Sequence, residues 1–165
     1  TMSTLRVDSI RGQTADGTNR YVVQVVHTNK TSSFSTTSTT FTDVTGLSAT
    51  ITPQSVNNKI LVTLSTVTGD NTGSRMKLFN IVRGSTNIGQ PDSAGSVSST
   101  RTVYDNVADT AHMVHATVLD SPATTSATTY KVQCRINSAG TMYVGTRQSG
   151  DAEQCSTLTL MEIAQ

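Results

Sequence analysis

Two histidines, His112 and His115, stand three residues apart, and this spacing suits a shared metal ion when both residues lie on one face of a helix. The surrounding segment, residues 111–119, instead alternates in the manner of a strand, in which residues three apart point to opposite faces. We therefore predict no shared metal ion at this pair. The third histidine, His27, is predicted to be solvated at a strand end, although in a symmetric trimer it would meet its own copies near the axis.

Cys134 and Cys155 are the two cysteines of the chain. Two cysteines do not build a disulfide framework, and a domain of 165 residues does not need one. Cys134 falls on an inward position of an alternating segment, which predicts a small buried apolar side chain. A bridge between Cys134 and Cys155 stays open as an alternative, if strand pairing brings the two together.

The acidic residues are mostly single and fall in expected turns, where turn formation explains them without catalysis. Examples are Asp70, Asp92, Asp151 and Glu153. Asp151 and Glu153 together leave a weak calcium site as an alternative. The chain has no G-x-S-x-G motif, no recognisable Cys-His arrangement and no glycine loop for phosphate. We predict that the protein is not an enzyme and that it uses no cofactor.

The composition argues against two classes of partner. The net charge is +1, and the chain has neither a basic stripe nor the aromatic platforms on which nucleic-acid binders stack bases. No apolar run approaches the roughly 20 residues that span a bilayer, and the first residues lack the apolar region of a secretory signal. We predict no nucleic-acid binding and no membrane insertion.

The stretch from Phe41 to Thr66 organises the predicted fold. Its residues 47–51 alternate apolar and polar side chains up to Pro53, as in a strand with one buried face. After a polar break, residues 60–64 are apolar at both parities, which predicts a strand shielded on both faces. Two strands around a short turn cannot hide their apolar faces alone, so other segments must supply an opposing sheet.

Further strands are predicted along the rest of the chain, with no segment of helical periodicity. They cover residues 21–26 as a first core strand, 76–83, 88, 111–119, 130–136, 141–145 and 156–163. Residues 28–40 are predicted to form a long loop with a short edge strand, and residues 137–140 to close a hairpin. The predicted fold class is all-β, a two-sheet antiparallel jelly-roll-like sandwich over residues 21–165.

Residues 1–20 differ from this body. Leu5, Val7 and Ile10 are isolated apolar residues on a short polar segment, and they can be buried only against something else. We predict an extended arm for attachment or oligomer formation, with a strand packed on its own domain as the alternative.

If each successive strand crosses the sandwich in the opposite direction, the loops divide between two ends. One end would carry residues 29–39, 69–74, 91–98, 121–127 and 148–155. The other would carry residues 53–58, Gly84, 106–110, 138–140 and both termini. Candidate contacts in the tip loops of the first end are Asp70, Asn71, Thr124, Thr125, Gln148, Asp151 and Glu153.

Several segments carry a resemblance to a known group. Thr4-Leu-Arg-Val-Asp-Ser-Ile-Arg-Gly12 resembles the opening of short tail-fibre and appendage proteins of marine and cyanobacterial tailed phages. Residues 34–53, 119–133 and 156–165 are similar to the body of the same group. The resemblance implies a virion protein, a homotrimer and a jelly-roll-like head of the trimeric C1q/TNF kind. It carries over no functional residues, and the lack of a repetitive shaft leaves a fibre tip, a tail adhesin and a capsid knob open.

The favoured function is a homotrimeric tail fibre or appendage of a phage virion, assembled in the host cytoplasm. Its arm would bind other virion proteins of tail or capsid, and its tip loops would bind the host surface, in the first place a glycan. One alternative is a capsid decoration or cement protein that stabilises the shell. A further alternative is a non-viral carbohydrate-binding sandwich, although such modules usually offer a Trp or Tyr platform and this chain has no Trp.

Overall fold

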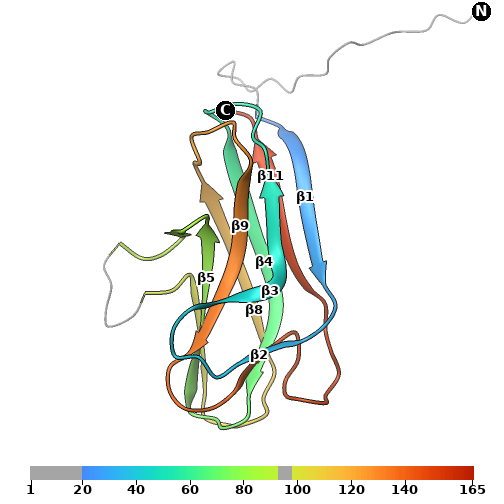
Figure 1. Cartoon of the computed structure of the whole chain (residues 1–165), viewed down its shortest axis with the longest axis vertical. Coiled ribbons are helices and arrows are strands. Elements are labelled where there is room, and N and C mark those ends of the chain that lie inside the picture. The colour runs from blue at the N-terminus through green and yellow to red at the C-terminus, as the bar shows by residue number, and fades with distance from the viewer. Residues whose placement is uncertain (1–19, 93–97) are drawn as a thin grey trace, which may run out of the picture.

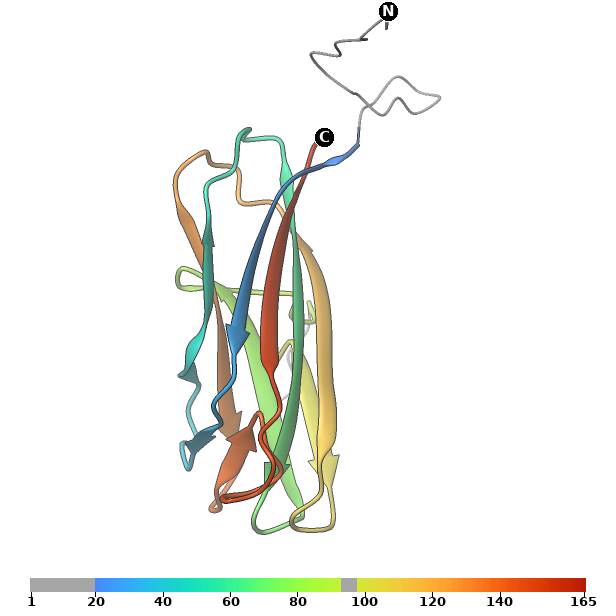
Figure 2. The same ribbon diagram turned by 90° about the vertical axis from the view of Figure 1, so that its right-hand side faces the viewer.

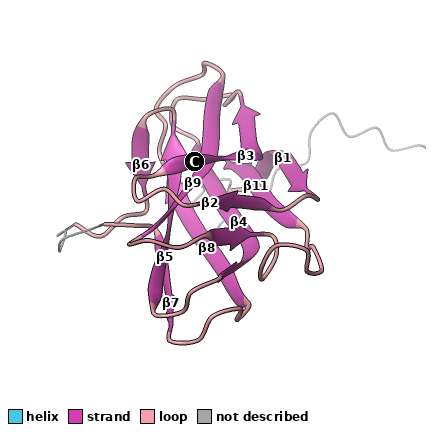
Figure 3. Ribbon diagram, turned by 60° about the horizontal axis from the view of Figure 1, so that its bottom comes forward, coloured by secondary structure: helices cyan, strands magenta, loops and turns pink. Residues whose placement is uncertain are grey.

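The structure is a computed structural model that describes residues 20–92 and 98–165. These residues form eleven strands and no helix (Figure 3). In chain order the strands are β1 (Val22–Lys30), β2 (Phe34–Thr36), β3 (Thr42–Ile51), β4 (Lys59–Asp70), β5 (Arg75–Arg83), β6 (Thr86–Ile88), β7 (Arg101–Asp105), β8 (His112–Asp120), β9 (Thr128–Ile136), β10 (Met142–Val144) and β11 (Ser156–Ile163). The predicted arm, with Leu5, Val7 and Ile10, lies outside the described residues.

The strands form two antiparallel sheets that face each other as two layers (Figures 1 and 2). Sheet A has the order β1-β11-β4-β10-β2, with β8 paired to β4. Sheet B has the order β3-β9-β5-β6, with β7 paired to β5. The chain passes from one sheet to the other between β2 and β3, β3 and β4, β4 and β5, β7 and β8, β8 and β9, and β9 and β10. This is the jelly-roll-like sandwich that the strand pattern predicts.

Alternation along the strands builds the core between the layers. In β9, Tyr130, Val132, Cys134 and Ile136 are all fully buried, and the side chains between them are only partly buried or exposed. In β4, Ile60, Val62 and Leu64 face the core, whereas Leu61 and its outward neighbours are partly exposed. The prediction that residues 60–64 are shielded on both faces is therefore wrong for the outer face.

The predicted strands on either side of Pro53 exist, but they lie in different layers. β3 belongs to sheet B and β4 to sheet A, so residues 52–58 cross between the sheets. The expected hairpin at residues 137–140 is also a crossing, because β9 lies in sheet B and β10 pairs with β2 and β4 in sheet A. A turn signal in the sequence indicates a reversal without indicating which sheet receives the next strand.

The first strand is an edge strand, where a core strand was predicted. β1 pairs with β11 in sheet A, and Val22 and Val25 are 50% and 55% exposed. Val26 is partly buried against the core, so only one face of the valine run is used. A run of valines that is apolar at both parities resembles a strand with two covered faces, and here nothing in the described chain covers the second one.

The eleven strands make eight passages along the length of the sandwich, because three of these passages are each divided into two strands. Two pairs of strands run in one direction because both members are antiparallel to the same strand: β6 and β7 to β5, and β10 and β11 to β4. β1 and β2 also run in one direction, because they are antiparallel to β11 and β10. Each pair forms two parts of one passage. The excursion between β10 and β11, residues 145–155, lies over the outer face of β4. There the Gly145 amide donates to the Val67 carbonyl at 2.8 Å.

These interruptions overturn part of the predicted assignment of loops. Residues 121–127 lie at the end of residues 53–58 and Gly84, since Asp120 pairs with Ile60. Residues 106–110 and 138–140 lie at the opposite end with residues 69–74: the Asp109 amide donates to the Asp70 carbonyl, and Arg75 Nε donates to the Ala139 carbonyl.

The first and last described residues of the body share one end of the sandwich, which agrees with the predicted position of the termini. The Ala164 amide donates to the Tyr21 carbonyl at 3.0 Å (Figure 1). The end that carries Tyr21 and Ala164 is called the terminal end below, and the end that carries residues 69–74 is called the distal end.

Gly69 provides a test of the excursion over β4. A Cβ atom at this position would lie 2.1 Å from the carbonyl oxygen of Arg147, so backbone would have to move. We expect Gly69→Ala to lower the free energy of unfolding in urea by about 3 kcal/mol or more. Gly84→Ala is the control, because its φ is +57° with no atom nearby, and it should cost about 1–2 kcal/mol from backbone strain alone. Equal losses in the two variants would contradict the close packing of the excursion.

Candidate functional site

The outer face of sheet A carries a row of apolar side chains across four strands. Cα pairing runs from β8 through β4 and β11 to β1, and the row consists of Leu119, Leu61, Met161 and Val25. Leu119 and Val25 are 53% and 55% exposed, and Leu61 and Met161 are partly exposed. Toward the distal end, the next row contains Thr117, Thr63, Thr159 and His27. The apolar row therefore lies near the terminal end, on an open sheet face.

The outer face of sheet A carries Lys59 beside Ile163 near the terminal end, and it has no formal charge at the outward positions that extend from there toward the distal end. Its outward positions in β4 from Leu61 to Ser65, in β8 from Met113 to Leu119, in β11 from Thr157 to Ile163 and in β1 from Val25 to Asn29 include no Asp, Glu, Lys or Arg. The outer face of sheet B differs, because Lys131 Nζ donates to Asp43 Oδ2 at 2.8 Å and Gln133 donates to Asp43 Oδ1 at 2.7 Å. Depletion of charge at the centre of an apolar patch is a feature of protein interfaces.

A second candidate is an ionic cluster buried at the distal end of the core. The Nζ atom of Lys77 lies 2.5 Å from Asp70 Oδ2 and 2.6 Å from Asp105 Oδ2, and the Lys77 side chain is fully buried. His112 Nε2 lies 2.9 Å from Asp105 Oδ2. Neither this nitrogen nor Asp105 Oδ1 has a well-directed hydrogen bond, although both are buried atoms. The cluster thus contains two carboxylates, one amine and one imidazole.

Strand ends position this cluster. Lys77 lies on β5 at the inward parity of Phe79 and Ile81, Asp70 ends β4 and Asp105 ends β7. The two connections at this end touch, since a Cβ at Gly73 would lie 2.7 Å from the Ala108 nitrogen.

Asp70 is held as a carboxylate within the cluster. Its Oδ1 accepts hydrogen bonds from the Gly73 amide at 2.6 Å and the Thr72 amide at 3.0 Å. Burial raises the pKa of Asp70, but the hydrogen bonds from Lys77, Thr72 and Gly73 outweigh burial and leave the pKa below its usual value. Asp70 is 1% exposed, so its predicted role as a surface contact of a tip loop is wrong.

The other predicted contacts are distributed over both ends. Asn71 is exposed at the distal end, and its Oδ1 accepts a hydrogen bond from the Thr141 amide at 2.9 Å. Thr124 and Thr125 lie at the terminal end, because residues 121–127 follow β8. The structure therefore does not bring Thr124 and Thr125 together with Asn71, and the predicted single tip is wrong in this respect.

Gln148, Asp151 and Glu153 lie in the excursion between β10 and β11. Asp151 Oδ2 accepts from Arg147 Nε at 2.7 Å, whereas Glu153 Oε1 accepts from the Ser33 hydroxyl at 2.6 Å. Hydrogen bonds from the Ala152 amide and then from Arg147 lower the pKa of Asp151, and those from the Ser33 hydroxyl and amide lower the pKa of Glu153. The two carboxylates face different partners, and the described residues contain no group of three metal-ligating side chains. Whether these three residues contact a partner stays a prediction.

The histidines and cysteines lie as their strand parity predicts. His112 points inward to Asp105, and His115 lies on the outer face, where its Nε2 is 3.2 Å from the Thr117 hydroxyl. Cys134 is fully buried and Cys155 is exposed, and both are free thiols. The alternative of a bridge between Cys134 and Cys155 is therefore wrong.

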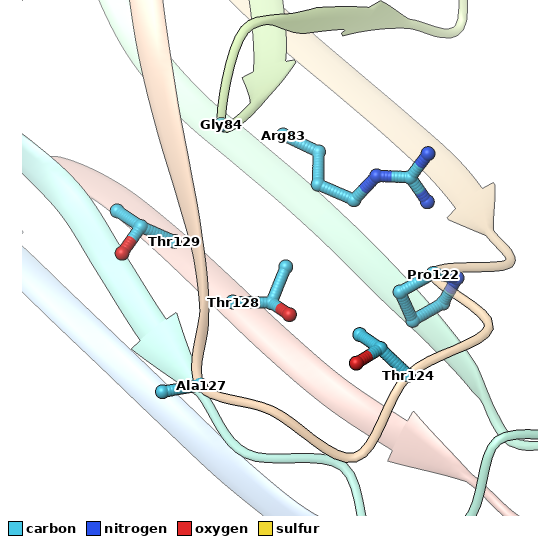
Figure 4. A pocket seen from close by; sticks show the side chains of 7 residues that line it. All are labelled: Arg83, Gly84, Pro122, Thr124, Ala127, Thr128 and Thr129. Carbon is cyan, nitrogen blue, oxygen red and sulfur yellow. The ribbon is translucent and has the colours of Figure 1, made fainter.

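A shallow pocket of about 450 Å³ opens at the terminal end beside Arg83 (Figure 4). It is lined by Arg83, Gly84, Pro122, Thr124, Ala127, Thr128 and Thr129. The guanidinium of Arg83 is engaged by Asp120, at 2.9 Å, and by the Ser121 carbonyl, at 3.0 Å. Asp120 also accepts from the hydroxyl of Tyr130 at 2.7 Å, and burial together with this carboxylate raises the pKa of Tyr130. The pocket's one cation is therefore already paired.

At the terminal end, the buried carboxylate of Glu162 joins β11 to β1 and to residues 54–58 by hydrogen bonds. Glu162 Oε1 accepts hydrogen bonds from Asn58 Nδ2 at 2.6 Å and from the Gln54 amide at 2.7 Å, and Oε2 accepts from Gln24 at 2.6 Å. Burial raises the pKa of Glu162, but these hydrogen bonds outweigh burial and leave the pKa below its usual value.

Glu162 and Lys77 both lie at positions that sequence analysis passed over. A usable signal exists for each, because a charged residue continues an inward apolar series: Leu158-Leu160-Glu162 in β11, and Lys77-Phe79-Ile81 in β5.

Comparison with known proteins gives a weak structural likeness and no match in sequence. The chain matches no family model and no curated protein. A solved structure described as "Structure of infectious bursal disease virus Gx strain" is 14% identical to this chain, with a TM-score of 0.42. The match covers 98% of this chain and 44% of that one, so the chain spans less than half of its length. In the described residues no helix is long and apolar enough to cross a membrane.

The Glu162 network predicts a pH dependence of stability. Its folded pKa is depressed, so its contribution is present above the unfolded pKa of about 4.3 and is lost as the pH falls through the folded value. We expect Glu162→Gln to cost about 1–3 kcal/mol near neutral pH, measured by urea unfolding, and the difference from the unsubstituted chain to shrink below about pH 4. A difference that stays constant from neutral to acid pH would show that the charge of Glu162 is irrelevant.

The two thiols should react at very different rates. Burial raises the pKa of Cys134 to about 12, so the native protein should expose one reactive thiol, that of Cys155. A colorimetric thiol assay should count one group in the folded protein and two after unfolding. Cys155→Ser should remove the native reactivity and leave the unfolded group. Two thiols of equal native rate would contradict the burial of Cys134.

Proposed function

We propose that this chain is a structural protein of a virion, a homotrimeric appendage without enzymatic activity. Two kinds of observation support the proposal. The sequence resembles short tail-fibre and appendage proteins of tailed phages at residues 4–12, 34–53, 119–133 and 156–165. The outer face of sheet A offers the surface on which copies of the chain would associate, and this face is the observation that carries the proposal.

The association surface is the apolar row of Leu119, Leu61, Met161 and Val25 with the uncharged row of Thr117, Thr63, Thr159 and His27 on its distal side. Lys59 lies at the terminal edge of this surface. Open sheet faces of monomeric proteins usually bear charged side chains, as the outer face of sheet B does with Asp43 and Lys131. An uncharged sheet face can approach a second copy without burying unpaired charge. His27, which lies beside this row, would then come close to its own copies, as expected for a trimer axis.

The arrangement of the chain ends suits attachment through the N-terminal arm. The described chain starts beside Ala164 at the terminal end, so the arm joins the body at the end opposite the distal loops. In the proposed function the arm binds other virion proteins. The distal loops, residues 69–74, 106–110 and 138–140, face the host surface, where their polar side chains would bind a glycan.

The trimer is tested by adding a charge to the apolar row. We expect the unsubstituted chain to have the mass of a trimer in size-exclusion chromatography with light scattering, and Leu119→Lys to have the mass of a monomer, because a buried unpaired charge would oppose association. Ser48→Lys is the matched control, since it adds the same charge to an exposed position on the outer face of sheet B, and it should remain a trimer. A monomeric unsubstituted chain at micromolar concentration would refute the trimer.

The virion role is tested by deleting residues 1–12. The shortened protein should keep the unfolding temperature of its body but should no longer be found on purified particles, detected by antibody labelling in electron microscopy. Label on the tail of the full-length particle would support the appendage, whereas label over the icosahedral shell would replace it by capsid decoration. Particles that retain the shortened protein would refute attachment through the arm.

A further inference from the structure

The buried cluster of Lys77, Asp70 and Asp105 holds an amine in contact with two carboxyl groups and away from water. Lys77 is fully buried, and the exposed fractions of the Asp70 and Asp105 side chains are 0% and 9%. The proposed virion function makes no use of this cluster. A buried ion pair is common enough as a structural element, but one ammonium with two carboxylates poses an additional problem of charge.

Two ionised carboxylates around one ammonium would leave a net negative charge inside the protein when the neighbouring imidazole of His112 is neutral. Binding one further proton makes the cluster neutral, which lowers the cost of burial. Asp70 is the poorer site for this proton, since the amides of Thr72 and Gly73 donate to its Oδ1 and favour the carboxylate. Asp105 is the better site, because its Oδ1 is buried without a hydrogen-bond partner. The cluster then consists of a carboxylic acid, an amine and a carboxylate base.

We propose that Lys77 and Asp105 condense to form an amide bond between their side chains, with Asp70 as the general base. The Asp70 carboxylate takes one proton from the Lys77 ammonium, and the neutral Nζ attacks Cγ of the Asp105 carboxylic acid. The Nζ–Cγ bond forms, the Cγ–Oδ2 bond breaks, and Oδ2 leaves as water with two protons, the acid proton of Asp105 and the second Nζ proton, which Asp70 transfers. Asp70 ends protonated, so atoms and charge balance, and no oxidant, reductant or cofactor is needed.

The geometry favours this reaction over the same reaction in solution. Lys77 Nζ is 2.6 Å from Asp105 Oδ2 and 2.5 Å from Asp70 Oδ2, so nucleophile, electrophile and base are already in contact. Exclusion of water favours the neutral amine and the neutral acid over the ion pair, and it removes the solvent that would reverse the condensation. His112 Nε2 lies 2.9 Å from the departing Oδ2 without a directed hydrogen bond to it, so no role in the reaction is assigned to it.

The bond would link two neighbouring strands of sheet B across a long segment of chain. Lys77 pairs with Val103 and Arg75 pairs with Asp105, so the linked residues are diagonal neighbours on β5 and β7. The closed loop contains β6 and the connections around it. A covalent link of this kind stabilises mainly by restricting the unfolded chain, in the same way as a disulfide.

Mass spectrometry of the purified full-length protein tests the proposal directly. We expect an intact mass lower than that of the sequence by one water, and a tryptic product in which Met76–Arg83, uncut at Lys77, is joined to Thr102–Lys131. The joined peptides decide the matter, because an aspartate that cyclises onto its own backbone also loses water. The exposed pair of Lys131 and Asp43, at 2.8 Å, is an internal control and should remain unlinked.

Three results would overturn the proposal. Separate tryptic peptides cut after Lys77, with no loss of water, would show that the cluster is an ordinary ion pair. A product joining Met76–Arg83 to Ile60–Arg75 would make Asp70 the electrophile in place of Asp105. Asp70→Asn should fold, as judged by circular dichroism, and remain unlinked, and a link at the normal yield in this variant would refute the role of Asp70 as base. Lys77→Arg keeps the charge and should show no link.

Discussion

The structure depends on the burial of one face of every long strand against the opposing sheet. A single sheet made from these sequences would leave Ile60, Val62 and Leu64 of β4 in water, and the same holds for Tyr130 and Val132 of β9. The free energy of burial is gained only when two such faces meet. This constraint explains why the chain repeatedly crosses between the layers, and why strands adjacent in sequence on either side of Pro53 are not neighbours in one sheet.

Polar residues close the core at each end, and they do so in different ways. Glu162 continues the inward series of β11 and is satisfied by amide donors alone, so it is an anion without a cation. Lys77 continues the inward series of β5 and is satisfied by two carboxylates. The first arrangement fixes residues 52–58 to β11 and β1. The second concentrates an amine and two carboxyl groups in one place, which is the arrangement that the proposed amide bond requires.

Sequence reasoning succeeded where a local pattern had one structural meaning. Alternation at residues 130–136 and 156–163 predicted β9 and β11, and together with the other alternating segments it predicted the fold class. It failed where the partner of a strand decides the outcome. The valines of β1 are equally apolar at both parities, and only their pairing with β11 shows that Val25 faces outward. The assignment of loops to the two ends was wrong in part because it assumed that each strand reverses direction. β10 and β11 run in the same direction, and no residue type in residues 145–155 indicates this.

The two outer faces of the sandwich respond differently to the same requirement. A strand face turned away from the core must meet water or another protein surface, and side chains that hydrogen-bond across strands are one way to meet water. The outer face of sheet B takes this way, with Thr50 bonded to Thr129 and Lys131 to Asp43. The outer face of sheet A places Leu119 and Val25 at corresponding outward positions, where contact with water is unfavourable for their apolar side chains. The outer face of sheet B also exposes an apolar pair, Met76 and Tyr104, so apolar exposure alone does not distinguish the two faces. Under the proposed function, association with other copies of the chain would cover the apolar row of sheet A.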